Sequence, residues 1–137
     1  MDNFGKYLAA LGRVLLALIF VRAGINKLGS IDATAAEMAN HGIPLSNILI
    51  FGAIAMELGA GLLLMVGLFA RCAALALFFY TLTLALLFHA YWAAPAAQAR
   101  LQASFFFGHL SIMGGMLVVA AFGAGALSLD ALIRRRI

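Results

Sequence analysis

A few ionisable side chains stand inside the long apolar runs of this sequence, and their types are those that pair charges, carry protons or bind polar ligands. The candidates are Arg13, Lys27, Glu57, His89 and His109. Glu57 lies in the middle of an apolar run over residues 47–69, which is long enough to cross a bilayer as a helix. An ionisable group at such a depth is costly and normally marks a paired or functional position. Glu57 is therefore the centre of the candidate site.

The partner of Glu57 is expected on the first apolar run. Arg13, Gly24 and Lys27 recur there at helical spacing and share one face. Because Glu57 lies between the depths of the two cations, either side chain can reach it, and the sequence does not choose between them. A buried carboxylate that pairs with a cation has a lower desolvation cost. The simplest interpretation is a structural ion pair that fixes helix packing.

The composition places these side chains in a membrane. Of the 137 residues, 66% are hydrophobic and only 10% are charged, whereas a soluble domain carries about a quarter charged residues. The net charge of +4 comes from basic residues that are scattered or terminal and form no nucleic-acid-reading motif. We therefore expect contact with anionic lipid and not with nucleic acid. The single cysteine, Cys72, excludes an internal disulfide and a cysteine-based zinc cage.

The apolar periodicity predicts an all-α membrane protein, a four-transmembrane-helix bundle that forms one domain over residues 1–137. The helices are expected at about 7–27, 47–69, 71–92 and 103–122. A short interfacial helix is expected between the first two, with Ser30 as its N-cap.

Four spans place both chain ends on one side of the bilayer. That side carries Lys6, Arg71 and three arginines at the C-terminus, while the other side carries Lys27 and Arg100. The positive-inside rule then places both termini in the cytoplasm.

Short motifs follow one another in a specific order along nearly the whole chain. They are Arg13, AGINKL at 23–28, HGIP at 41–44, ELGAG at 57–61, GLFAR at 67–71 and FH at 88–89. In this order and spacing the chain resembles the DoxX family of small four-helix bacterial membrane proteins. It departs from the family pattern at Arg22, where a small or uncharged residue is expected, and at His109, where asparagine is expected.

The resemblance implies a multi-pass protein of the bacterial inner membrane, in some relatives linked to quinone-dependent sulfur oxidation or to membrane redox complexes. We therefore expect an accessory or quinone-interacting subunit of a membrane redox assembly, with an outward-facing polar cavity around Glu57. Its expected partners are the bilayer, the proteins of such a complex and a second copy of the chain. The alternative is a non-catalytic scaffold whose buried charges only fix helix packing. Neither interpretation assigns a catalytic residue.

A quinone site needs an apolar slot, a polar group for each carbonyl and an ionisable group for protons. His89 or His109 can contact a carbonyl oxygen, while Lys27 and Glu57 supply charge and exchange protons. Haem is disfavoured as a cofactor, because His109 lies about one turn deeper than His89 and two axial ligands must face each other. Metal binding through His41, His89 and His109 is conceivable, but the spacing of these histidines is not diagnostic of a metal site, so none is assigned. A transporter for a small solute is also disfavoured, because four short helices enclose little room.

Overall fold

The computed structural model describes residues 3–135, and every regular element in that range is helical. The elements are α1 (Asn3–Leu28), α2 (Ile31–Asn40), α3 (Ser46–Ala55), the π-helical turn η1 (Met56–Ala60), α4 (Gly61–Val66), α5 (Ala70–Phe88), the 3-10 turn η2 (Tyr91–Ala93), α6 (Ala96–Phe122) and α7 (Leu129–Arg134). Four segments are long and apolar enough to cross a membrane, namely Asn3–Leu28, Ser46–Val66, Ala70–Ala93 and Ala96–Phe122. The prediction of an all-α membrane protein with four spans is confirmed.

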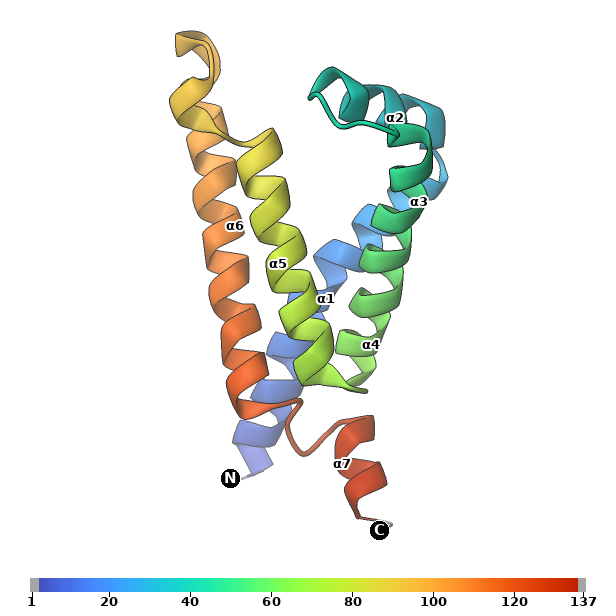
Figure 1. Cartoon of the computed structure of the whole chain (residues 1–137). Helices are drawn as coiled ribbons and strands as arrows, with labels where there is room; N and C mark the ends of the chain where they lie inside the picture. The colour runs from blue at the N-terminus through green and yellow to red at the C-terminus, as the bar shows by residue number, and fades with distance from the viewer. Residues whose placement is uncertain (1–2, 136–137) are drawn as a thin grey trace.

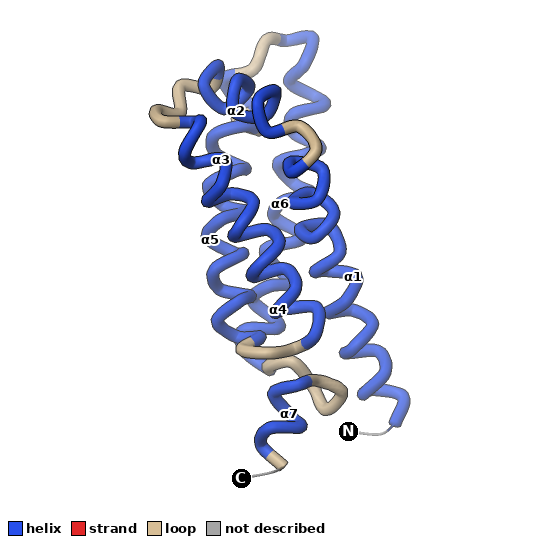
Figure 2. Tube along the Cα trace, turned by 90° about the vertical axis from the view of Figure 1, so that its right-hand side faces the viewer, coloured by secondary structure: helices blue, strands red, loops and turns tan. Residues whose placement is uncertain are grey.

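The spans run side by side, with α2 lying across one end of the bundle (Figure 1). α1 begins and α7 ends at the opposite end, and the view turned by 90° shows the same arrangement (Figure 2). α5 packs along α6, and α1 packs against η1 and α4. α2 packs on α3, where Ala35 of α2 and Ile50 and Ile54 of α3 form a buried apolar cluster.

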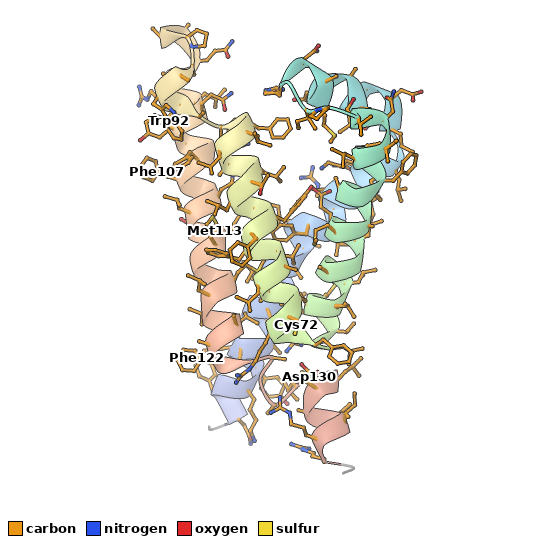
Figure 3. The ribbon with its side chains drawn as sticks, viewed as in Figure 1. Cys72, Trp92, Phe107, Met113, Phe122 and Asp130 are labelled. Carbon is orange, nitrogen blue, oxygen red and sulfur yellow. The ribbon has the colours of Figure 1, made fainter. Side chains whose placement is uncertain are left out.

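The core between the spans is built largely from small side chains, which let helices approach closely. Its buried members are Ala17, Phe20, Leu64, Ala70, Ala73, Ala74, Leu77, Met116 and Ala124. Many large apolar side chains point outward instead. Phe107 and Phe122 project from α6 away from the other helices and are 56% and 83% exposed (Figure 3). In a bilayer such faces contact lipid, while the helices satisfy their own backbone hydrogen bonds.

The last span begins earlier than its hydropathy indicates. α6 starts at Ala96, directly after Pro95, whereas the sequence-based boundary was residue 103. The amide nitrogens of Gln98 and Ala99 donate to the Pro95 carbonyl oxygen. Alanine is the best helix former, so the alanine-rich stretch after Pro95 extends the helix beyond its strongly apolar part. α5 ends at Phe88, before the predicted end at residue 92.

The connection between the second and third spans is a tight turn over residues 67–69. Gly67 and Phe69 both have positive φ, of 73° and 48°. Asp130, in the C-terminal helix α7, accepts hydrogen bonds from the backbone nitrogens of Phe69 at 2.8 Å and Ala70 at 3.0 Å. These nitrogens stand at the start of α5, where they have no partner within the helix. The C-terminal segment therefore caps the third span.

Candidate functional site

Glu57 is carried by a break in the regular helix of the second span. The π-helical turn η1 runs from Met56 to Ala60 and contains it. Such turns are rare and frequently occur at functional sites. Within the turn and directly after it the chain approaches α1 closely. A Cβ atom at Gly24 would lie 2.6 Å from Leu58 Cγ, and one at Gly61 would lie 3.2 Å from Val21 Cγ2.

Lys27 is the cation that pairs with Glu57. Its Nζ lies 2.9 Å from both Oε1 and Oε2 of the carboxylate. Only 2% of the Glu57 side chain is exposed, against 24% of the Lys27 side chain. The pair therefore joins α1 to η1 at a point where the carboxylate is buried and the ammonium group keeps partial access to its surroundings.

Tyr80 completes the hydrogen bonds of the carboxylate. Its hydroxyl donates to Glu57 Oε1 at 2.7 Å, from α5. The sequence analysis did not select Tyr80, although a signal was present. Glu57 and Tyr80 lie at nearly equal distances along the chain from the turn at Leu68, so an antiparallel pair of helices brings them to the same level.

A cavity of about 180 Å³ borders this ion pair. Its lining residues are Ile19, Phe20, Ala23, Lys27, Glu57, Thr81, Leu84, His109 and Ile112. The Thr81 hydroxyl is buried and has no hydrogen-bond partner among the described residues. A buried polar group without a partner is unusual and costly, so it marks a place where a further polar group fits. Thr81, like Tyr80, was missed from the sequence.

The two candidate histidines lie next to each other, but only His109 lines the cavity. Their ring centroids are 4.8 Å apart. His89 Nδ1 lies 2.8 Å from Gln102 Oε1, and His109 Nδ1 lies 2.8 Å from the carbonyl oxygen of Phe105. A carbonyl oxygen only accepts, so Nδ1 of His109 carries the proton and its Nε2 has a lone pair when the ring is neutral.

Arg13 does not contact Glu57, which resolves the choice that the sequence left open. Its guanidinium donates to the carbonyl oxygens of Met65 at 3.3 Å and Leu127 at 2.9 Å, and to that of Ala124. These carbonyls belong to the end of the second span and to the segment after α6. Arg13 therefore fastens the C-terminal segment to the bundle, and it lies outside the cluster around Glu57.

The described part of the chain holds no group of three or more His, Cys, Asp or Glu side chains placed to bind a metal ion. The ring of His41 contacts the ring of Phe88 at a centroid distance of 4.6 Å and an interplanar angle of 45°. The polar groups that do converge are Lys27, Glu57, Tyr80, Thr81 and His109.

Comparison with known proteins places this arrangement in context. The model of the DoxX family matches residues 8–90. Inner membrane protein YphA of Escherichia coli strain K12 is 34% identical over 123 residues, which cover 90% of this chain and 88% of that protein. Inner membrane protein YqjF of the same strain is 32% identical over 124 residues, which cover 90% of each chain. No solved structure matches the chain significantly.

Proposed function

This chain belongs to the DoxX family of membrane proteins, and we propose that it serves as an accessory subunit of a membrane redox assembly whose cavity beside Glu57 receives the ring of a quinone. One observation carries the proposal. A cavity of about 180 Å³ borders an ion pair, a histidine and the buried, unpartnered hydroxyl of Thr81. This role requires a redox protein as a partner, and it allows a second copy of the chain as another.

The lining fits the ring of a quinone in size and chemistry. An engineered cavity of about 150 Å³ in another protein binds benzene, so a cavity of about 180 Å³ accommodates one six-membered ring. Its walls include Ile19, Phe20 and Ile112, which are apolar. Quinone carbonyls only accept hydrogen bonds, and the Thr81 hydroxyl and the Lys27 ammonium are donors. Both therefore suit this ligand class.

A bound quinone would supply the capacity to take up two electrons and two protons. The residues of this chain would then handle the protons. The Glu57 carboxylate would serve as a proton acceptor, while Lys27 Nζ and the Tyr80 hydroxyl donate hydrogen bonds to it and fix the position of Oε1. His109, whose Nδ1 is directed at a backbone carbonyl, has its Nε2 free to accept a hydrogen bond or a proton. Electrons would come from a partner protein.

The test is to extract lipids from the purified protein, measure quinone by mass spectrometry, and titrate the protein with a short-chain ubiquinone while following its melting temperature. Ala23→Leu extends a side chain into the cavity without removing a charge, and we expect it to abolish quinone binding. Ala121→Leu is the matched control, because Ala121 is exposed on α6, and it should bind as the wild type does.

A second pair of variants covers the case in which Ala23→Leu fails to fold. Thr81→Val keeps the side-chain shape and removes the unpartnered hydroxyl, so binding should weaken several-fold. Thr83→Val is its control, since the exposed Thr83 bonds only the carbonyl oxygen of Phe79 on its own helix. Equal quinone binding by both valine variants, together with binding by Ala23→Leu, would remove the quinone from this cavity.

A non-catalytic scaffold is the second candidate, and one observation favours it. Both oxygens of Glu57 already accept hydrogen bonds, from Lys27 and Tyr80, and these bonds hold α1, η1 and α5 together. In that case no quinone co-purifies and none raises the melting temperature. The variant Lys27→Met/Glu57→Gln separates the two functions, because a scaffold needs only that it folds, whereas a quinone site also loses binding.

The orientation of the protein is part of the same proposal. We place both termini in the cytoplasm, because Lys6, Arg71, Arg134 and Arg135 lie at the end of the bundle opposite α2. In a variant without Cys72, an impermeant thiol reagent added from outside should label Glu37→Cys on α2 and spare Arg134→Cys. The reverse pattern would invert the topology.

A further inference from the structure

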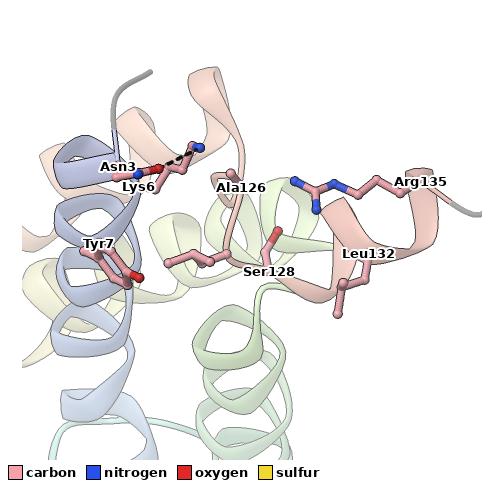
Figure 4. Close-up of a pocket in the computed structure, with 8 residues that line it drawn as sticks. Asn3, Lys6, Tyr7, Ala126, Ser128, Leu132 and Arg135 are labelled. Carbon is pink, nitrogen blue, oxygen red and sulfur yellow. Dashed lines mark hydrogen bonds between the residues drawn. The ribbon is translucent and has the colours of Figure 1, made fainter.

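A larger cavity, of about 450 Å³, lies at the end of the bundle where α1 begins and α7 ends. Its lining residues are Asn3, Lys6, Tyr7, Ala126, Leu127, Ser128, Leu132 and Arg135. Figure 4 shows Lys6 and Tyr7 on α1 at one side of the cavity and Arg135 at the other. None of these residues belongs to the Glu57 site, so the cavity is a separate feature of the fold.

The charges that face this cavity are positive. Within residues 3–135, neither Lys6 nor Arg135 is within ion-pairing distance of a carboxylate. Lys6 Nζ donates to the side chain of Asn3, 3.3 Å away. Asp130 is the acidic residue that the described chain has at this end, and its two oxygens already accept from the backbone nitrogens of Phe69 and Ala70. Among residues 3–135, the cavity therefore presents two cations that have no carboxylate as a counter-charge.

The walls between these cations are apolar. Leu127 and Leu132 are 44% and 53% exposed, and the ring of Tyr7 lies across the cavity from Leu132 (Figure 4). The candidate span Asn3–Leu28 begins and the candidate span Ala96–Phe122 ends at this end of the bundle, so in a bilayer we expect the cavity to lie at the level of the lipid headgroups. A ligand that suits both features has an anionic group joined to an apolar body.

The wall formed by the C-terminal segment is fixed by contacts that need no ligand. Arg13 donates to the carbonyl oxygens of Ala124 and Leu127. The Ser128 hydroxyl donates to the Gly125 carbonyl oxygen at 2.7 Å, and the Asp130 nitrogen donates to the Gly67 carbonyl oxygen at 2.9 Å. A site whose walls are already in place loses little conformational freedom when a ligand binds.

We propose that this cavity binds the phosphate headgroup of an anionic phospholipid, with Lys6 and Arg135 as its phosphate ligands and Leu127, Leu132 and Tyr7 against its glycerol and first acyl carbons. Arginine presents a planar fork of donors that matches phosphate, and lysine adds a compact charge. The proposal does not rest on the quinone site, because the two cavities share no lining residue.

The test is native mass spectrometry of the purified protein with equal amounts of phosphatidylglycerol and phosphatidylcholine. The wild type should retain phosphatidylglycerol preferentially. Lys6→Gln/Arg135→Gln removes both cavity cations and should lower that preference about thirtyfold, since each basic group near an anionic lipid contributes about 1 kcal/mol and every 1.4 kcal/mol corresponds to a factor of ten. Arg22→Gln/Arg134→Gln is the matched control. It removes the same charge from two exposed arginines that do not line the cavity, and the preference should persist.

Two further arms make the outcome decisive. Lys6→Arg/Arg135→Lys keeps both charges and should restore most of the preference, while melting temperatures check that every variant is folded. A second sample receives inorganic phosphate at millimolar concentration, which should not displace the lipid. An equal loss in the control variant would overturn the site in favour of general surface attraction, and displacement by phosphate would overturn the lipid in favour of a soluble anion.

Discussion

Arg13 and Glu57 are both charges buried inside an apolar bundle, yet their surroundings differ. Arg13 is bonded to backbone carbonyl oxygens of Met65, Ala124 and Leu127, which are neutral groups held by the chain itself. Glu57 is bonded to side chains, an ammonium and a phenol, and it borders a cavity. The first arrangement uses a charge to fasten backbone segments together. The second leaves a charged group beside space that another molecule can enter.

The difference indicates how a buried charge that holds the fold can be told from one that marks a site. The partners of Arg13 cannot change without moving the backbone, so its contacts have one geometry. The partners of Glu57 are side chains that can change rotamer, and the hydroxyl of Thr81 beside them has no partner among the described residues. Unsatisfied polar atoms next to a charge are therefore more informative than the charge alone.

The largest effect is expected from Arg13→Met. It leaves three backbone carbonyls without their donor, and bonds to a charged group contribute about 1.5–3 kcal/mol each, so we expect a loss of about 4 kcal/mol or more. Thermal unfolding in detergent, followed by circular dichroism, measures it. Arg22→Met is the control, because Arg22 is exposed, and its change should stay within about 0.5 kcal/mol. Similar melting temperatures for the two variants would contradict the fastening role.

The next effect is expected at the ion pair. Glu57→Gln leaves Lys27 without its counter-charge, and since that lysine is partly exposed we expect a loss of about 2–3 kcal/mol, below the usual 3–5 kcal/mol for a broken buried pair. Adding Lys27→Met should recover much of it, with a coupling of at least about 1 kcal/mol. Adding Arg13→Met instead should be additive within about 0.5 kcal/mol. A coupling of Glu57 to Arg13 as large as that to Lys27 would erase the distinction between the two regions.

Tyr80→Phe tests the hydrogen bond between the third span and the carboxylate. It removes one donor to a charged acceptor and should cost about 1.5 kcal/mol in the same unfolding experiment. Tyr7→Phe provides the comparison, because Tyr7 is 68% exposed, and it should be close to neutral. A neutral result for Tyr80→Phe would mean that another donor takes over the bond at Glu57.

The smallest effect on stability is expected from Thr81→Val. Replacing an unpartnered buried hydroxyl by a methyl of similar shape should be neutral or stabilise the protein by about 0.5 kcal/mol. The measurement is again the melting temperature, here of protein stripped of bound lipid. A loss above about 1 kcal/mol would show that the hydroxyl is bonded within the cavity even without a ligand, as a trapped water would bond it.

The sequence alone predicted the membrane spans, the family and Glu57 as the acidic member of the ion pair. Long apolar runs require helices in lipid, so the four-span fold and DoxX membership were predicted and are confirmed. The cationic partner of Glu57 could be narrowed to Lys27 or Arg13, because the depth of a residue in the membrane and the helical face it occupies both follow from its number. The remaining choice could not be made, since the partners of Arg13 are backbone carbonyls in connecting segments, and residue types do not reveal where a carbonyl lies.

Other features depend on tertiary packing and were out of reach or overlooked. The π-helical turn at 56–60 has no local sequence signature, because it arises where the second span meets α1 at Gly24 and Gly61. Asp130 was seen as a tail residue, and only the folded chain brings it to the start of α5. Tyr80 was within reach, because a tight antiparallel turn fixes which residues stand at the same level.

The π-helical turn also bears on how the second span could change in evolution. A π turn holds one residue more than the α turn that it replaces, so losing one residue there restores a regular helix and leaves the flanking helices in register. Gly59 is suited to such a deletion, since nothing lies within 4 Å of the position its Cβ would occupy. A deletion in α3 would instead rotate one half of the span by about 100° against the other. We therefore expect a one-residue deletion to be tolerated in the segment that carries Glu57, where it would redirect the carboxylate and leave the packing of the flanking helices unchanged.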